Sequence, residues 1–296
     1  MERIESAQNK KIKWIAGLKQ KQRRKAEGVF VAEGVRLCEM AVLSGWRLRL
    51  CLFTPERAQE ARAKRLLEQI ATRGCPLYET SHEVYKKASD TETPQGILLV
   101  LEEKATSLAE LCTGKSCGMK TSAEARAVDV AKSSPEKNGP LLVVLDGVQD
   151  PGNAGTILRT ADAAGADGVI LLHNTLDVFS GKTVRASMGS IFHLPLVSDV
   201  SRQELQDFLC REGIDLLAAV LDEAARPYYE ANYNGGIALA FGNEGKGISS
   251  ELQAMAARKI FIPMFGQAES LNVSTAAALV LYEAVAVRRG FGRHSQ

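Results

Sequence analysis

Short, mainly apolar segments in the C-terminal half of the chain are the feature that most restricts its fold. Helix-like stretches separate these segments from one another. They lie at residues 141–145, 168–172, 215–221, 237–241 and 259–262. A continuous apolar strand must be covered on both faces, which is typical of a parallel sheet with helical crossovers. We therefore predict an α/β domain built on a parallel sheet over residues 140–296.

The N-terminal half predicts a second, smaller domain over residues 1–101. Strand-like and helix-like segments alternate here too, from a basic helix over residues 1–25 to a last apolar strand at 97–101. Residues 102–139 are rich in Lys, Ser, Thr, Gly and Glu and read as a linker or insertion. A length of 296 residues is ordinary for two domains.

Basic residues are concentrated near the N-terminus. Between Gln8 and Lys25 there are eight of them and no acidic residue, although the net charge of the whole chain is only +2. Such a cluster suits contact with nucleic-acid phosphates, and the alternative is a solvated helix face. The candidate phosphate contacts in this cluster are Lys10, Lys11, Lys21, Arg23 and Arg24.

Cysteine spacing argues against a metal site or a disulfide framework. The six cysteines include no CxxC pair, and no histidine lies at a ligand-like interval from any of them. The sequence shows neither a secretory signal nor an apolar run long enough to span a membrane. We therefore expect no metal, no membrane association and a cytoplasmic protein with free thiols.

Three glycine-rich loops follow apolar strands of the predicted sheet, where parallel sheets bind ligands. In the first, residues 145–159, Asn153 is a plausible helix N-cap and Arg159 lies nearly two turns further on. This loop lacks both the GxGxxG and the GxxxxGK[ST] spacing. A plain turn before a capped helix is its alternative interpretation.

The second and third loops place further polar residues at the same edge. Glu244 lies between glycines in residues 240–248, as a charge partner or a cap. Ser270 and Asn272 precede a nearly all-apolar helix in residues 262–274, and either of them can cap it. One cap needs one such residue, so the extra polar side chains favour a functional role.

These loops resemble the three motifs of the SpoU (TrmH-like) family of RNA 2'-O-ribose methyltransferases. NAGTILRTA at 153–161 resembles motif 1, FGNEGKGI resembles motif 2 and IPMFGQAESLNVSTAAAL resembles motif 3. All three occur in order within residues 141–289. Gln8-Asn9-Lys10 and Phe30-Val31-Ala32-Glu33-Gly34 resemble, more loosely, the RNA substrate-binding domain often attached to this family.

The resemblance implies a SPOUT-type domain with a deep trefoil knot, an exception to the usual unknotted topology. It implies S-adenosylmethionine (AdoMet) as cofactor and a homodimer through the C-terminal domain. The positions that the resemblance assigns to the cofactor are Ala219, Leu221, Gly242, Asn243, Gly247, Ile262, Met264, Leu271 and Val273.

The resemblance also implies a catalytic set. It consists of Asn153, Arg159, Glu244, Ser270 and Asn272. The family assigns Arg159 to the ribose, sometimes as the base. A guanidinium is charged at essentially any pH, so electrostatic stabilisation of the 2'-oxygen is the safer interpretation. We expect the other four residues to orient Arg159 and the ribose, and Arg185 to contact RNA phosphate.

The attached N-terminal domain favours 23S ribosomal RNA over tRNA as the substrate, by analogy. A tRNA methyltransferase and a non-catalytic RNA-binding homologue are the alternatives. A dehydrogenase is disfavoured by the missing GxGxxG motif. Trp14 and Trp46 can stack on bases or pack in the core, and packing is the more common role.

Overall fold

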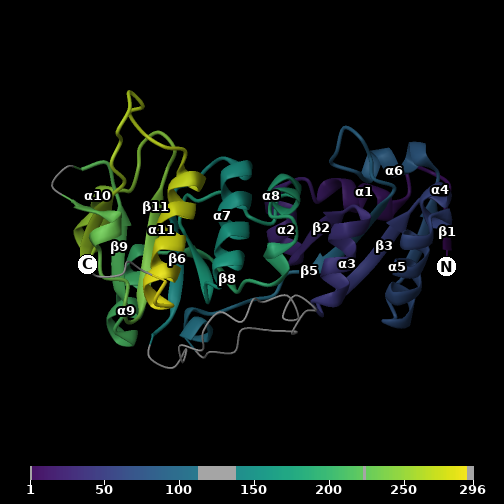
Figure 1. Ribbon diagram of the computed structural model, residues 1–296. Helices are drawn as coiled ribbons and strands as arrows, with labels where there is room; N and C mark the ends of the chain where they lie inside the picture. The colour runs from purple at the N-terminus through teal and green to yellow at the C-terminus, as the bar shows by residue number, and fades with distance from the viewer. Residues whose placement is uncertain (1, 113–137, 223–224, 292–296) are drawn as a thin grey trace. The chain divides into compact units, whose positions relative to one another are not determined.

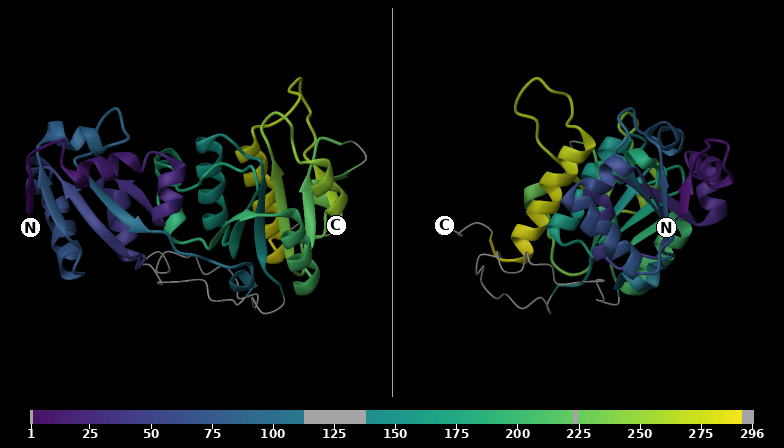
Figure 2. Two further views of the ribbon diagram at one scale, coloured as in Figure 1. Left: turned by 180° about the vertical axis from the view of Figure 1, so that it is seen from behind. Right: turned by 90° about the vertical axis from the view of Figure 1, so that its right-hand side faces the viewer.

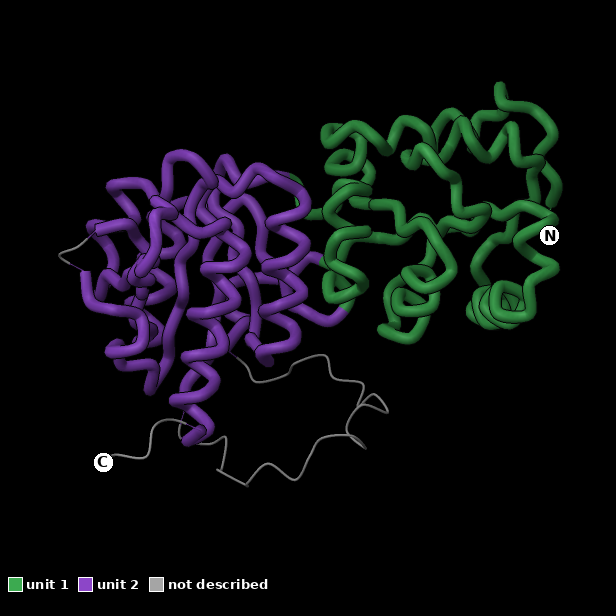
Figure 3. The backbone as a smooth tube through the Cα atoms, turned by 45° about the horizontal axis from the view of Figure 1, so that its top comes forward, with its two compact units in different colours: residues 1–104, 177–192 green, residues 105–176, 193–296 purple. Residues whose placement is uncertain are grey.

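The computed structural model describes residues 2–112, 138–222 and 225–291. The chain divides into two units (Figure 3). Unit 1 comprises residues 1–104 and 177–192, and unit 2 comprises residues 105–176 and 193–296. The short segment 177–192 therefore groups with the N-terminal part, although the sequence placed it inside the C-terminal domain. Most of the predicted linker, residues 113–137, lies outside the described residues.

Unit 1 is built on a mixed five-stranded sheet with the order β1-β4-β3-β5-β2 (Figure 1). Its strands are β1 (Glu2–Ile4), β2 (Val29–Glu33), β3 (Leu48–Phe53), β4 (Leu77–Thr80) and β5 (Ile97–Glu102). Its helices are α1 (Lys10–Gly17), α2 (Lys21–Glu27), α3 (Val35–Leu43), α4 (Pro55–Gln59), α5 (Ala61–Thr72), α6 (His82–Ala88) and α8 (Gly181–Ala186). β5 is antiparallel to both of its neighbours, and the other pairs are parallel.

The predicted single helix over residues 1–25 is wrong. The segment forms β1 and then two short helices, and Asn9 begins α1 by accepting a hydrogen bond from Lys11 N at 2.8 Å. Ile12, Ile15 and Leu18 are buried on one side of the segment. The chain leaves the helical path at Leu18–Gln20, where the side chain of Arg24 binds the carbonyls of Leu18 and Lys19.

Trp46 is half-buried and packs within an aromatic cluster of unit 1, so packing, the more common of its two expected roles, is the one seen. Its ring lies edge-on to Phe30, with ring centroids 5.3 Å apart, and also contacts Phe179 and Phe192. The indole Nε1 donates to the Phe192 carbonyl at 3.0 Å, which satisfies its single donor. The aromatic cluster thus joins β2 to the segment 177–192 within unit 1.

Unit 2 contains a seven-stranded, wholly parallel sheet in the order β10-β12-β9-β11-β6-β7-β8. Its strands are β6 (Leu141–Asp146), β7 (Gly168–Leu172), β8 (Leu196–Val200), β9 (Asp215–Ala219), β10 (Arg226–Pro227), β11 (Ile237–Gly242) and β12 (Arg258–Phe261). The five apolar segments of the sequence form five neighbouring strands of this sheet, as predicted. These strands are β12, β9, β11, β6 and β7. The parallel α/β class is confirmed, whereas the knot stays a prediction.

Helices cover both faces of this sheet. They are α7 (Pro151–Ala164), α9 (Arg202–Glu212), α10 (Ser250–Met255) and α11 (Val273–Arg288). α7 and α11 lie side by side along one face (Figures 1 and 2). Residues of α9 and α10 pack with Leu142, Val144 and Ala240 in the core on the other face. Burial on both faces explains why the strands are apolar throughout.

Arg288 joins the end of α11 to the amino ends of the central strands. Its guanidinium donates to the carbonyls of Tyr233 at 2.9 Å, Gly139 at 3.0 Å and Gly235 at 2.5 Å. Replacing it by alanine would remove all three bonds at once. We expect Arg288→Ala to lower the free energy of unfolding by about 2 kcal/mol, as measured by urea denaturation.

Arg289→Ala is the matched control for this prediction. Arg289 is the next residue and is exposed. Its loss should change the free energy of unfolding by less than about 0.5 kcal/mol. Equal stability of the two variants would show that the carbonyl contacts of Arg288 contribute nothing.

Candidate active site

A cavity of about 480 Å³ lies at the carboxyl edge of the unit 2 sheet. Its walls come from the ends of β9, β11 and β12, from the loop 242–248 and from residues 262–273 before and at the start of α11. All nine residues that the resemblance assigned to the cofactor line it: Ala219, Leu221, Gly242, Asn243, Gly247, Ile262, Met264, Leu271 and Val273. The volume falls in the range of small-molecule and cofactor sites.

The loop 242–248 folds back on its own starting strand. Asn243 and Gly247 exchange two backbone hydrogen bonds, each 2.9 Å long. A Cβ on Gly242 would overlap the backbone of Gly247 and Ile248, so only glycine fits at this position. Gly247 adopts a φ of 67°, in the left-handed region that favours glycine. The backbone that approaches Gly242 closely is therefore that of the loop's own last residues.

Glu244 points from this loop toward the loop after β6. Its Oε1 accepts hydrogen bonds from Asp150 N at 3.0 Å and Asn153 Nδ2 at 3.1 Å, and its Oε2 accepts one from Gln149 N at 3.2 Å. Partial burial, the largest single influence, would raise the pKa of Glu244. The donors from Asn153, Asp150 and Gln149 together outweigh it and lower the pKa below its usual value. Glu244 is therefore an ionised acceptor that joins motif 2 to motif 1.

Asn153 lies at the centre of this polar group. Its Nδ2 donates to Glu244, and its Oδ1 accepts from Asn272 Nδ2 at 2.9 Å. The amide thus uses both of its ends to connect residues that are far apart in the sequence. Asn272 also begins α11, because its Oδ1 accepts from Ser274 N at 2.9 Å. The three sequence motifs therefore meet in one hydrogen-bonded chain, Glu244–Asn153–Asn272.

The prediction that Asn153 caps α7 is wrong. The N-cap is Asp150, whose side chain accepts from Asn153 N at 2.8 Å, and Pro151 is the first helical residue. Proline favours this first position because it lacks an N–H that would need a partner. The shift by one turn leaves the Asn153 side chain available for Glu244 and Asn272.

Arg159 and Ser270 lie apart from this chain of hydrogen bonds. Arg159 is exposed on α7, and Ser270 is exposed at the wall of the cavity. Among the described residues, no hydrogen bond joins Arg159 to Asn153 or Glu244. The expected orientation of the Arg159 fork by these two side chains is thus not seen, because Asn153 and Glu244 bind each other.

The structure separates the basic residues of unit 1 into two groups. Lys10, Lys21 and Arg23 are exposed. Arg24 is buried, and its Nη2 lies 2.5 Å from Asp177 Oδ2 while Nη1 donates to the Leu18 carbonyl at 2.6 Å. Arg24 therefore has a structural role in unit 1 and is not a surface cation.

Two other predicted RNA contacts, Lys11 and Arg185, are half-buried in unit 1. Lys11 Nζ lies 3.5 Å from Glu2 and 4.6 Å from the centre of the Tyr78 ring. Arg185 is half-buried on α8, beside the backbone of Gly181. Both side chains keep some exposure. At Lys11, a phosphate contact would compete with the contacts to Glu2 and Tyr78.

Two acidic residues of the cavity wall were not singled out by the sequence. Asp222 follows the end of β9, and Glu269 precedes Ser270 in the third loop. The signal for Asp222 was its place just beyond an apolar strand, where parallel sheets bind ligands. An acidic side chain there can accept hydrogen bonds or bind a cationic group of a ligand.

Within the described ranges, no three His, Cys, Asp or Glu side chains are grouped as a metal site would need. None of the helices in these ranges has both the length and the apolar character of a membrane span.

The chain matches two family models, one for each half of the sequence. Residues 140–282 match the SpoU rRNA methylase family, and residues 9–99 match the MRM3-like substrate-binding domain. The first match contains the cavity and all three polar loops, whereas the second covers most of the N-terminal part of unit 1.

Known proteins resemble the chain over nearly its whole length. The 23S rRNA (guanosine(2553)-2'-O)-methyltransferase of Bacillus subtilis is 35% identical, over 95% of this chain and 98% of that protein. The 23S rRNA (uridine(2479)-2'-O)-methyltransferase of Streptomyces viridochromogenes is 30% identical, over 97% and 92%. The AdoMet-bound rRNA methyltransferase from Sinorhizobium meliloti has a TM-score of 0.79 and 30% identity, covering 99% of both chains.

Fold, cavity and matches together define a two-part α/β methyltransferase with a substrate-binding domain at its N-terminal side. The chain belongs to the SpoU rRNA methylase family. The resemblance inferred from the three motifs is thereby confirmed.

Proposed function

We propose that this protein transfers a methyl group from AdoMet to a ribose 2'-hydroxyl of 23S ribosomal RNA. The observation that carries the proposal is the chain Glu244–Asn153–Asn272, which brings all three motifs together beside a cavity of cofactor size. The substrate class is supported by the relatives from Bacillus subtilis and Streptomyces viridochromogenes, both named as 23S rRNA 2'-O-methyltransferases.

The cavity fits AdoMet in its chemistry. Its wall combines apolar residues such as Phe241 and Val280, which suit an adenine ring, with acidic residues such as Asp222, which suit an α-ammonium group. Polar loop residues of the second and third motifs complete it. When bound, AdoMet supplies an electrophilic methyl group on a sulfonium. The similar AdoMet-bound protein from Sinorhizobium meliloti supports this assignment.

Arg159 is the residue we propose to contact the reacting ribose. Its exposed guanidinium on α7 is free to bind an RNA phosphate and the 2'-oxygen together. As a cation, the guanidinium stabilises the alkoxide character of the attacking oxygen instead of removing its proton. Asn153, Glu244, Ser270 and Asn272 would orient the RNA and the loops around it.

A methyl-transfer assay tests this function. Protein and tritiated AdoMet are incubated with total RNA from a strain that lacks the gene. We expect label in 23S rRNA as an alkali-resistant 2'-O-methyl dinucleotide. Label in tRNA alone would overturn the substrate assignment. AdoMet binding without any label would favour a non-catalytic RNA-binding protein.

Exposed basic residues of unit 1 are the proposed phosphate contacts, with Lys10, Lys21 and Arg23 as the clearest candidates. We expect the double variant Lys10→Ala, Lys21→Ala to bind rRNA more weakly. Each lost phosphate contact removes a counterion-release term, so the slope of log affinity against log salt should become shallower by about 2. Filter binding at several salt concentrations measures both effects.

Lys86→Ala, Lys87→Ala is the matched control, because both lysines are exposed on α6 of the same unit. If this control lost affinity equally, a general electrostatic effect would explain the result, and the proposed site at Lys10 and Lys21 would be wrong.

We further propose a cytoplasmic homodimer that forms through unit 2. Leu279 and Tyr282 are exposed on α11, with exposed fractions of 39% and 52%. Exposed apolar side chains on one helix are a common feature of subunit interfaces. A monomeric molar mass in light scattering would contradict the dimer.

A further inference from the structure

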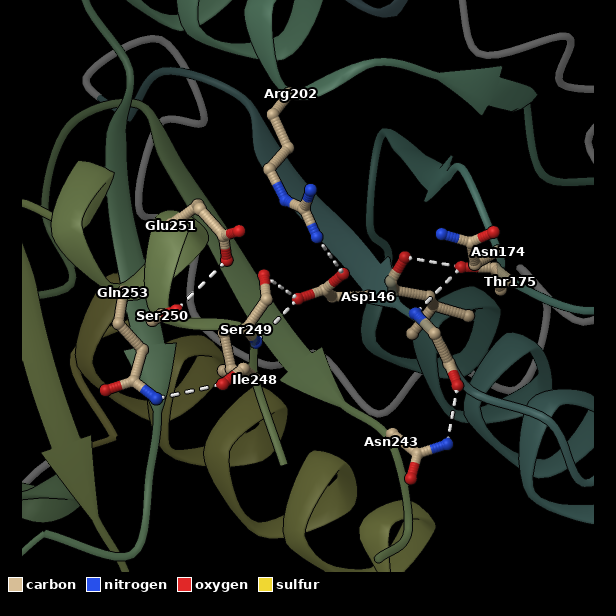
Figure 4. A network of polar contacts seen from close by, with 12 residues as sticks. Asp146, Asn174, Thr175, Arg202, Asn243, Ile248, Ser249, Ser250, Glu251 and Gln253 are labelled. Carbon is tan, nitrogen blue, oxygen red and sulfur yellow. Dashed lines mark hydrogen bonds and ion pairs between the residues drawn. The ribbon is translucent and has the colours of Figure 1, made fainter. Parts of the chain in front are cut away.

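Asp146 is a buried carboxylate that the proposed reaction does not use. It ends β6 and is only 5% exposed. Its Oδ2 accepts hydrogen bonds from Ser249 N at 2.8 Å and Ser249 Oγ at 2.6 Å (Figure 4). A buried carboxylate is costly unless such bonds compensate for its lost hydration. Asp146 does not line the cavity itself.

Asp146 lies next to both ends of the loop 242–248, through Gly242 at the entrance and Ser249 after the exit. In the pairing of β6 with β11, Asp146 is the register partner of Gly242, where the loop begins. Ser249 follows directly after the loop. The bonds to Ser249 therefore bring the exit of the loop against the end of β6, next to its entrance. Gly247 and Ile248, just before Ser249, are part of the cavity wall.

Neighbouring residues restrain the same two loops by other contacts. Asn243 Nδ2 donates to the Gly147 carbonyl at 2.8 Å, and Thr175 binds both Leu145 O and Gly147 N (Figure 4). These contacts reach the entrance of the loop 242–248 only. Its exit is held by the bonds of Asp146 to Ser249, by the two backbone bonds between Asn243 and Gly247, and by a bond from Gln253 Nε2 to the Ile248 carbonyl at 2.9 Å.

Arg202, the first residue of α9, lies on the other side of Asp146. Its Nη2 is 3.8 Å from Asp146 Oδ1, within the distance of an ion pair. Arg202 Nε is buried and has no hydrogen-bond partner among the described residues. The guanidinium is thus held near Asp146 by charge, without a bidentate bond.

We propose that Asp146 is a positioning residue for the cofactor. Its charge and its two bonds to Ser249 keep the exit of the loop 242–248 in place, so that the backbone of Gly247 and Ile248 forms the wall of the AdoMet cavity. The inference rests on the proposed function, because it assigns AdoMet to this cavity. Glu244 and Asn153 are bonded independently of Asp146, so the loss of Asp146 should weaken cofactor binding more than it slows the chemical step.

Asp146→Asn tests this proposal, since asparagine keeps the shape but removes the charge. We expect the Kd and the KM for AdoMet to rise on the order of ten-fold, the effect of losing one charge-assisted bond. The kcat at saturating AdoMet and the affinity for RNA should stay near their wild-type values. Calorimetry with AdoMet and steady-state methyl transfer measure these quantities.

Two further variants keep the test decisive if Asp146→Asn folds poorly. Ser249→Ala keeps the backbone bond and should raise the KM for AdoMet about three-fold. In the double variant Asp146→Asn, Ser249→Ala, the two effects on KM should be less than additive. Asp167→Asn is the control: Asp167 Oδ2 accepts from Leu141 N at 2.7 Å, at the opposite end of the same strand. It should lower stability without changing the Kd for AdoMet.

The outcomes separate the positioning role from the proposed function. A wild-type protein that fails to bind AdoMet would overturn the function itself. A wild-type protein that binds AdoMet, with Asp146→Asn and Ser249→Ala binding it equally well, would overturn only the role of Asp146. A rise in Kd for Asp167→Asn equal to that for Asp146→Asn would also overturn it, since general destabilisation would then explain the effect.

Discussion

Arg159→Ala is expected to reduce methyl transfer to 23S rRNA by a factor of about 10² to 10³. The guanidinium on α7 is the cation that we propose to stabilise negative charge on the attacking 2'-oxygen, and alanine removes it. Because Arg159 does not line the cavity, the Kd for AdoMet should stay unchanged. Single-turnover methyl transfer and calorimetry measure the two quantities separately.

Two companion variants make the result specific. Arg159→Lys keeps the charge but loses the planar fork, so its rate should lie between those of wild type and Arg159→Ala. Arg211→Ala removes an exposed arginine of α9 that pairs with Glu212, and it should leave the rate unchanged. A rate for Arg159→Ala close to that of wild type would exclude Arg159 from the chemistry.

Gly242→Ala is expected to abolish AdoMet binding. The added Cβ would overlap the backbone of Gly247 and Ile248, so the loop 242–248 would have to open and the cavity wall would move. Backbone cannot yield as a flexible side chain can. In the wild type, AdoMet at 100 times its Kd should stabilise the fold by about 2.7 kcal/mol. For the variant, the melting temperature should no longer respond to AdoMet.

Gly266→Ala is the control for this effect. Gly266 lies in the third loop, and a Cβ there would meet no atom within 4 Å. Its melting temperature should rise with AdoMet as that of the wild type does. If Gly242→Ala were still stabilised by AdoMet to the same extent, the close return of the loop would have no part in forming the site.

The sheet of unit 2 could be predicted from the sequence because its cause is local. Strands such as β7 and β11 are apolar at every position, and this pattern is typical of parallel strands covered on both faces. The same logic failed at the N-terminus. The apolar residues Ile12, Ile15 and Leu18 fit one helix, yet the break after Gly17 depends on Arg24 binding carbonyls there.

The candidate site divides in a similar way. Three motifs after three strands indicated which loops meet, since the carboxyl ends of parallel strands share one edge. The motifs could not predict which of their side chains bind each other. Asparagine is a residue type that favours the N-cap, but α7 begins with Asp150 as N-cap and Pro151 as first helical residue. The side chain of Asn153 is therefore available to bind Glu244 and Asn272.

The sequence by itself determined the parallel α/β class, the family and the loops that surround the cavity, because hydrophobic pattern and motif order are properties of the chain. Only the tertiary structure decided that Arg24 is buried against Asp177 and that Asp146 binds Ser249. Each of these contacts joins residues more than a hundred positions apart. Their free energy depends on burial and on the distance between the partners, which exist only once the chain has folded.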